Sequence, residues 1–215
     1  MKLADRFMVE LLGDDCIRIS GAAVAELRAV SSNLRNSEDW LAVVDGIEDC
    51  VVQFDPVKYL PDEALGLLSG LTEDMLVAGS EELEEPLDLA VSFSQADALD
   101  LKDISAALSL SEDEIIQRLV SAELRVDMMG FTPGFAYMSG LDDSMSVPRL
   151  KTPRQNVPAG SLGIAGGKCG TYALAGPGGW SIVGRVVSPL FDPERENPFL
   201  LKNGQRVRLK RVDVR

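Results

Sequence analysis

Five side chains between residues 137 and 168 are of types that can bind a small anionic ligand: Tyr137, Arg149, Arg154, Ser161 and Lys168. Arg149 and Arg154 each follow a proline, which restricts the local backbone, so each guanidinium can be held ready for a carboxylate or phosphate. Ser161 can donate to an oxyanion, and Tyr137 can hydrogen-bond a substrate amide. The two arginines could instead form internal salt bridges with the chain's many acidic residues.

Glycines are concentrated in the same stretch, at positions 160, 163, 166, 167 and 170. Glycine lets backbone N–H groups approach a ligand closely and form concavities that bind anions. Glycines are equally typical of the turns and bulges of a tightly wound barrel, so both interpretations stay open. We predict a substrate-binding groove lined by Tyr137, Arg149, Arg154, Ser161, Gly166, Gly167 and Lys168.

The composition excludes several kinds of chemistry. The chain contains no histidine, so it cannot supply the imidazole of a Ser-His-Asp or Cys-His site, or a histidine ligand for zinc. The three cysteines, at 16, 50 and 169, are odd in number and widely spaced, which predicts no disulfide framework, no metal site and a reducing, cytoplasmic setting. Lys168 does not complete a P-loop, because Leu162 and Cys169 stand where that motif needs Gly and Ser or Thr.

Charge is distributed unevenly along the 215 residues. Residues 1–148 have a formal balance of −21 and residues 149–215 one of +8, which gives the net −13. This split favours an anionic ligand or an acidic partner near the C-terminal part, or a packing of the acidic and basic parts on each other. With aromatic residues at only 6% and an acidic total, we expect no binding to nucleic acid. We also expect no membrane span, since no apolar run approaches the roughly 20 residues needed. We expect no secretory signal, since the first fifteen residues, MKLADRFMVELLGDD, are acidic and have no long apolar run.

The elements before the predicted site fall into two groups. Hydrophobic spacing in the first group predicts, in order, strands at 7–12 and 16–19, a helix at 24–34, strands at 41–47 and 49–54, and a helix that begins near 60. This order is typical of a small ferredoxin-like α+β unit, to which we assign residues 1–82. The charged segment at 79–86, GSEELEEP, is the predicted linker.

The second predicted domain is 83–215. It begins with a strand at 87–93, followed by two helices, the second marked by a capping-box pattern at 111–114, and a strand at 125–129. From Gly130 to Arg185, short apolar pieces alternate with turns, as in a β-barrel or sandwich with long functional loops.

Several motifs in the glycine-rich region occur in a specific order and spacing. They are Pro133-Gly134-Phe135 with Tyr137, Pro148-Arg149, Pro153-Arg154, Val157-Pro158-Ala159-Gly160-Ser161, Ile164-Ala165-Gly166, Pro177-Gly178-Gly179-Trp180 and Gly184-Arg185. This region closely resembles the signature of the carboxyltransferase C/D domain family, which contains the B subunit of 5-oxoprolinase, allophanate hydrolase subunit 1 and the KipI-like sporulation-kinase inhibitors. The N-terminal part matches that family only in layout.

The resemblance implies a cyclophilin-like β-barrel after the small α+β domain, and a shared site with a C-type, allophanate hydrolase subunit 2-like partner. It implies an ATP-dependent hydrolase that opens 5-oxoproline, a small anionic amide, with ATP bound together with the partner. A regulatory protein that inhibits a sensor histidine kinase is the alternative, and a carboxyltransferase component of a urea carboxylase-like biotin enzyme is the third. A neighbouring gene for the C-type subunit would favour the hydrolase, and a neighbouring kinase gene would favour the regulator.

The chain also departs from the family pattern. Lys168-Cys169 stands where Gln-Thr is usual, Ala173 replaces a usual Pro, and Ser92-Phe93-Ser94-Gln95 stands in place of a Cys-Tyr-Gly-Gly-type segment. A histidine common before the strand at 125–129 is absent. At these positions the resemblance carries over no residue role, and the catalytic residues stay unassigned.

Overall fold

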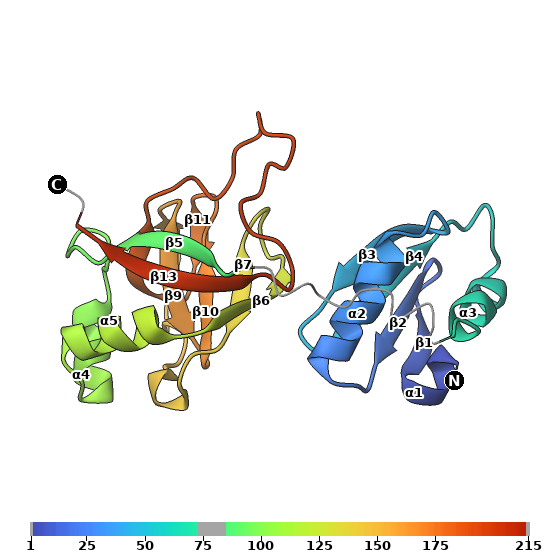
Figure 1. Ribbon diagram of the computed structural model, residues 1–215, viewed down its shortest axis with the longest axis horizontal. Coiled ribbons are helices and arrows are strands. Elements are labelled where there is room, and N and C mark those ends of the chain that lie inside the picture. The colour runs from blue at the N-terminus through green and yellow to red at the C-terminus, as the bar shows by residue number, and fades with distance from the viewer. Residues whose placement is uncertain (1, 73–84, 214–215) are drawn as a thin grey trace. The chain divides into compact units, whose positions relative to one another are not determined.

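The computed structural model describes residues 2–72 and 85–213. The chain divides into two compact units, Met1–Leu83 and Glu84–Arg215 (Figure 1). Of the predicted linker at 79–86, residues 79–84 lie outside the described residues, so the predicted boundary between 82 and 83 stays a prediction.

The first unit is a four-stranded antiparallel sheet with helices. Its sheet has the order β1-β2-β4-β3, and the connection from β2 through α2 to β3 leaves room for β4 between them. This split βαβ arrangement is the one predicted for a ferredoxin-like unit. The elements are α1 (Leu3–Arg6), β1 (Met8–Leu12), β2 (Cys16–Ser20), α2 (Val24–Arg35), β3 (Trp40–Asp45), β4 (Asp49–Phe54) and α3 (Pro61–Ser69).

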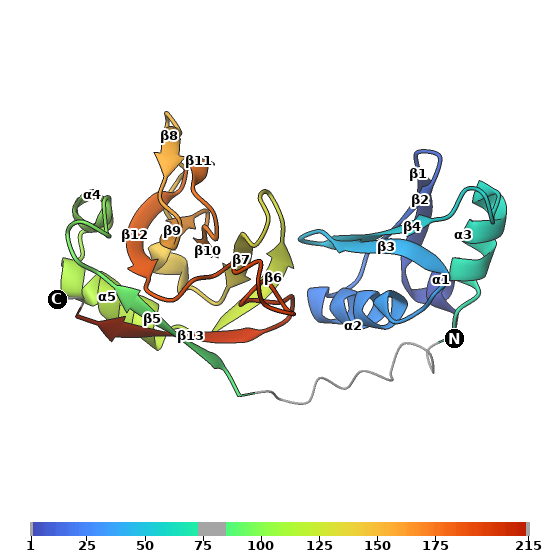
Figure 2. The same ribbon diagram turned by 90° about the horizontal axis from the view of Figure 1, so that it is seen from above.

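The core of this unit lies between one face of the sheet and its helices (Figure 2). Alternate residues of β4 point to that face, so Cys50, Val52 and Phe54 are fully buried. Leu27 and Val30 of α2 are buried against them, at the spacing of one helical face. The helix predicted to begin near 60 does so, with Pro61 in the first turn, where its missing N–H breaks no helical bond.

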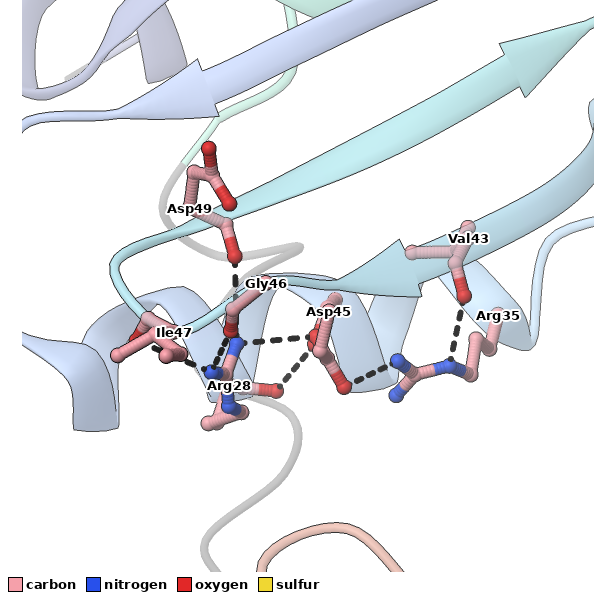
Figure 3. A network of polar contacts seen from close by, with 8 residues as sticks. Arg28, Arg35, Val43, Asp45, Gly46, Ile47 and Asp49 are labelled. Carbon is pink, nitrogen blue, oxygen red and sulfur yellow. Dashed lines mark hydrogen bonds and ion pairs between the residues drawn. The ribbon is translucent and has the colours of Figure 1, made fainter. Parts of the chain in front are cut away.

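A buried ion network fixes α2 to the turn between β3 and β4 (Figure 3). The carboxylate of Asp45 is fully buried and pairs with Arg28, whose Nη1 lies 3.1 Å away, and with Arg35. Arg28 also donates to the backbone carbonyls of Gly46 and Ile47, which belong to the turn itself. The two arginines therefore replace the water that the Asp45 carboxylate loses on folding.

Replacing Asp45 by Asn keeps the shape of the side chain but removes the charge that both arginines share. Because the buried Arg28 loses its pair with this carboxylate, we expect the free energy of unfolding of the first unit to fall by about 3 kcal/mol. Urea unfolding followed through Trp40, which is buried in this unit, measures the loss. Glu10→Gln is the control, since its pair with Arg18 is exposed and should contribute under about 1 kcal/mol. Equal effects of the two substitutions would contradict the role given to Asp45.

The second unit is built around a closed seven-stranded barrel with the order β10-β7-β6-β13-β5-β12-β9, and β9 also pairs with β10. The prediction of an α+β chain ending in a β-barrel is confirmed. The barrel strands are β5 (Leu87–Ser92), β6 (Leu124–Met129), β7 (Ala136–Ser139), β9 (Ser161–Ala165), β10 (Lys168–Thr171), β12 (Ser181–Val186) and β13 (Arg206–Val212).

The other elements of this unit cover and extend the barrel. Helix α4 (Leu101–Leu108) contacts β12, and α5 (Glu112–Ser121) contacts β13. The predicted capping box is present, because Ser111 accepts from the backbone N–H of Glu114 and the Glu114 carboxylate accepts from that of Ser111. Strands β8 (Arg154–Val157) and β11 (Gly176–Gly178) form a separate two-stranded sheet (Figure 2), and residues 143–145 form a short 3-10 helix. Within residues 2–72 and 85–213, no helix is long and apolar enough to cross a membrane.

Candidate functional site

One face of the barrel carries a row of aligned residues from four adjacent strands. The register places Tyr137 of β7 opposite Gly170 of β10, Gly170 opposite Gly163 of β9, and Gly163 opposite Ile182 of β12. Successive residues of a strand point to opposite faces, and the neighbours of this row belong to the largest apolar core. The Tyr137 row therefore lies on the face directed away from that core.

An aromatic cluster stands on this face, where Gly170 has no side chain. The ring of Phe135 contacts those of Tyr137, Tyr172 and Trp180, with centroid distances of 4.7, 4.9 and 5.7 Å and edge-to-face geometry. A Cβ atom at Gly170 would lie 2.8 Å from the Phe135 ring and 2.9 Å from the Trp180 ring. The glycine at 170 thus makes room for the rings that hold Tyr137 in place.

The loop that carries Arg149 is tied to this face by backbone hydrogen bonds. Gly166 donates to the carbonyl of Val147 at 2.7 Å, and Leu150 donates to that of Gly179 at 2.7 Å. Arg149 itself is exposed, and in the described part of the chain no carboxylate forms an ion pair with it. It is the predicted site cation whose charge remains available to a ligand.

Two tyrosine hydroxyls lie within electrostatic reach of Arg149. Burial raises the pKa of Tyr137, and the positive charge of Arg149 offsets part of that rise. Burial also raises the pKa of Tyr172. Both phenols are therefore protonated at neutral pH, but Tyr172 is buried, so Tyr137, which is partly exposed, is the tyrosine whose hydroxyl can donate to a bound oxygen atom.

Arg154 forms an internal ion pair. Its two terminal nitrogens form a bidentate pair with the buried Asp100, at 2.9 and 2.5 Å. Asp100 also accepts from the backbone N–H of Ile182 at 2.6 Å. Both Nη groups of the guanidinium are thus engaged in joining β8 to β12, in agreement with the internal salt bridge that the sequence left open. Binding of substrate by Arg154 stays a prediction.

Gly166 and Gly167 form the tight turn between β9 and β10. Both have positive φ angles, +55° and +72°, and Ala165 pairs with Lys168 across the turn. This is the geometry of a two-residue type I′ hairpin, which L residues with side chains adopt only with strain. The turn places Lys168 at the start of β10, where its ammonium lies 2.6 Å from a carboxylate oxygen of Asp127.

Asp127 and Ser139 were missed by the sequence reasoning. The Ser139 hydroxyl donates to the other oxygen of Asp127 at 2.7 Å. Asp127 lies between Val126 and Met128, where the register of β6 with β7 shifts at a bulge. The sequence signal for Asp127 was an acidic residue within a largely apolar strand, Leu124–Met129. Such a residue indicates a bulge, which often redirects a side chain toward a site.

Ser161 is buried at the start of β9, and its backbone carbonyl accepts from Tyr172 at 2.9 Å. Ser161 shares a face of β9 with Gly163, two residues away, so it belongs to the floor beneath the exposed groups. Tyr137, Ser161 and Lys168 therefore lie on one face of the barrel, with the Arg149 loop tied to it. Within the described ranges, no group of three His, Cys, Asp or Glu side chains could hold a metal ion.

The segment at 92–97 contains a polar turn. Ser92 and Ser94 donate to the same oxygen of Asp97, at 2.5 and 2.8 Å, and Arg185 lies 3.2 Å from the other oxygen. Burial, which raises the pKa of Asp97, is outweighed by these interactions, so its pKa is lowered overall. Asp97 is therefore ionised at neutral pH and fixes Arg185 beside β5.

Substitution of Gly170 by Ala tests whether the missing side chain sustains the aromatic cluster. The added Cβ would displace the buried rings of Phe135 and Trp180, so the free energy of unfolding should fall by about 1–3 kcal/mol. Trp180 emission should also shift, as measured in the Trp40→Phe background. Gly176→Ala is the matched control, because nothing lies within 4 Å of its added Cβ and its φ is not positive. A fully stable Gly170→Ala variant with unchanged emission would argue against this constraint.

Comparison with known proteins bears on both units. The family model for the carboxyltransferase domain, subdomain C and D, matches residues 7–201. The B subunit of 5-oxoprolinase from Haemophilus influenzae is 32% identical over 184 residues, which are 85% of this chain and 84% of that protein. Its counterpart from Escherichia coli O157:H7 is 41% identical over 132 residues, 60% of this chain but only 61% of that relative's length. The match to the counterpart from Bacillus subtilis covers 47% of that protein.

Solved structures agree in fold. The crystal structure of TTHA0988 superposes with a TM-score of 0.78 at 29% identity, covering 97% of this chain and 41% of that one. PH0987 from Pyrococcus horikoshii has a TM-score of 0.59 at 29% identity, covering 96% of this chain and 98% of that one. Urea carboxylase of Kluyveromyces lactis shares the fold alone, with a TM-score of 0.70 at 15% identity over 96% of this chain and 22% of that one. The chain therefore belongs to the carboxyltransferase C/D domain family, among the relatives of the 5-oxoprolinase B subunit.

Proposed function

We propose that this chain is the B subunit of an ATP-dependent 5-oxoprolinase-type hydrolase that acts with a C-type partner subunit on a small anionic cyclic amide. The observation that carries the proposal is the arrangement around Arg149. Its guanidinium is exposed and has no ion-pair partner in the described residues, and backbone hydrogen bonds tie its loop to the barrel face that carries the partly exposed Tyr137. A cation beside a hydroxyl donor suits a ligand that has one carboxylate and one amide.

The charge balance of this face favours a monoanion. Of the predicted site cations, Arg154 is neutralised by Asp100 and Lys168 by Asp127, which leaves Arg149 as the one without an ion-pair partner among the described residues. A compound such as 5-oxoproline has one carboxylate and a lactam group, which matches one cation and neighbouring hydrogen-bond donors. Urea is neutral and would leave Arg149 without a counter-ion, so the urea carboxylase-like role is less well supported.

Each residue then has a part in binding. Arg149 binds the substrate carboxylate, and the Tyr137 hydroxyl donates to the amide. The Gly166-Gly167 turn, without side chains, leaves room for the ligand to approach the backbone. Ser161 lies on the floor of the site, and Arg154 holds β8 in place.

The partner must supply what this chain lacks. Amide hydrolysis at neutral pH needs a base and an oxyanion stabiliser, and the chain has no histidine for the first role. Since the P-loop pattern fails at Leu162 and Cys169, we place ATP with the partner subunit. These two points support a protein that works only in a complex.

The test is ATP-dependent conversion of 5-oxoproline to glutamate by this chain mixed with the C-type subunit. Omitting this chain should abolish the reaction, and full activity without it would overturn the proposal. Arg149→Ala should raise KM about tenfold to hundredfold, the effect of losing one charge-assisted hydrogen bond. Lys102→Ala, an exposed lysine of α4, is the control and should leave KM unchanged.

Arg154→Ala should behave differently from Arg149→Ala. It leaves the buried Asp100 carboxylate without its cation, so we expect the melting temperature to fall in the absence of any substrate. A lowered affinity at unchanged melting temperature would instead place Arg154 in the binding site. Thermal unfolding and KM, measured on the same preparation, separate the two roles.

We further propose that the C-type subunit docks on an apolar patch formed by Phe131, Leu174 and Phe199. Phe131 is 63% exposed and has a φ of +72°, a conformation that is strained for a bulky residue. Its ring packs edge-on against Phe135, the centre of the aromatic cluster, with centroids 5.6 Å apart. Leu174 and Phe199 are also exposed. Phe199 packs against Gly134, which lies in the same loop as Phe131. The patch is thus continuous with the candidate site, and exposed aromatic side chains are typical of interface centres.

Phe131→Asp should weaken the complex with the C-type subunit at least tenfold, roughly the effect of removing an interface hot spot. Calorimetry on the purified subunits gives the affinity. Val57→Asp is the matched control, because Val57 is 92% exposed in the first unit and lies outside the patch. Equal affinities of the two variants would remove Phe131 from the interface, whether or not the complex hydrolyses 5-oxoproline.

A further inference from the structure

A polar trio stands among the apolar residues of the barrel. The carboxylate of Asp127 accepts from the Lys168 ammonium at 2.6 Å through one oxygen and from the Ser139 hydroxyl at 2.7 Å through the other. Asp127 is almost buried, with its side chain 10% exposed, whereas that of Lys168 is 32% exposed. The arrangement therefore anchors an accessible ammonium on a fixed, buried carboxylate.

The trio lies next to the groups already assigned to the substrate. Tyr137 is opposite Gly170, so Ser139 and Lys168, each two residues along, lie on the same face one repeat further on. That repeat corresponds to about 7 Å along the strands. The hydrogen bond from Gly166 to Val147 ties the turn before Lys168 to the loop that carries Arg149. Lys168 thus faces the region between Tyr137 and the Arg149 loop.

The pairing leaves Lys168 able to bind a neutral group. An ammonium has three N–H donors, and the ion pair with Asp127 uses one of them. Because the pair as a whole is neutral, it adds no net attraction for a second anion, but it still donates strongly to a carbonyl oxygen. The Ser139 hydroxyl, by fixing the other oxygen of Asp127, limits the positions that Lys168 can take.

We propose that Lys168 donates to the amide carbonyl of the substrate while Arg149 binds its carboxylate, and that Asp127 and Ser139 are positioning residues for Lys168. This inference rests on the proposed function, since it assumes a ligand with both groups. It divides recognition between two cations, of which Arg149 selects charge and Lys168 selects the carbonyl. Lys168 then acts as a determinant of specificity in this chain.

Three ligands separate the two contacts in binding measurements on the complete chain with its C-type subunit. 5-Oxoproline has both groups, cyclopentanecarboxylate has only the carboxylate, and 2-pyrrolidinone has only the lactam. Lys168→Met should weaken 5-oxoproline and 2-pyrrolidinone about tenfold to hundredfold and leave cyclopentanecarboxylate unchanged. Arg149→Ala should weaken 5-oxoproline and cyclopentanecarboxylate and leave 2-pyrrolidinone unchanged. Lys102→Met is the control for loss of a surface lysine.

The positioning role has its own readout. Asp127→Asn and Ser139→Ala should weaken only the two ligands that contain the lactam, and Lys168→Arg, which keeps a donor, should restore part of the affinity lost in Lys168→Met. If Lys168→Met weakens all three ligands equally, or none, the division of roles is wrong while the proposed function stands. If the unaltered complex binds no 5-oxoproline, the proposed function fails, and this inference fails with it.

Discussion

A carboxylate cannot be buried in an apolar interior unless a cation accompanies it, and this constraint determines much of the chain's polar structure. Asp45, Asp100 and Asp127 are buried, and each is neutralised by arginine or lysine. The first pair joins a helix to a turn, the second joins two sheets, and the third fixes an ammonium on the barrel face. Once these pairs are formed, most of the basic residues that looked available in the sequence are occupied, and Arg149 is the predicted site cation that stays free of an ion pair in the described ranges.

The fold was predictable because its signals are local. Hydrophobic spacing located the strands and the two longer helices of the first unit and the strands β5 and β6 of the second, and the capping box at Ser111 and the proline at 61 marked helix starts. After residue 130 the sequence indicated only short strands separated by turns. The pairing of charges was not predictable in this way, since Arg154 and Asp100 lie 54 positions apart, and Lys168 and Asp127 lie 41 apart. Such contacts arise only when the barrel closes, so the sequence could name the arginines but could not separate a ligand contact from a salt bridge.

The roles of the glycines were also not predictable from the local sequence. The sequence left open whether they serve a ligand or only the barrel, and the structure gives different answers at different positions. Gly166 and Gly167 adopt positive φ angles in a hairpin turn beside the site. Gly170, in extended backbone, instead leaves space for two aromatic rings from other segments. Nothing in the local sequence distinguishes these uses, because the second depends on which rings cross the strand in three dimensions.

The uneven charge along the chain has a physical resolution within the second unit. Acidic residues before position 149 pair with basic residues after it, as Asp88 does with Arg208, Asp97 with Arg185 and Asp113 with Arg211. The surplus of +8 in residues 149–215 is therefore largely consumed by internal pairs rather than presented to a polyanion. A site built from such a surface can offer only a few unneutralised donors, so it must recognise its ligand by the geometry of individual groups. This is the selectivity that the proposed ligand, a small monoanionic amide, would require, since one cation and a small set of neutral donors suffice to bind it.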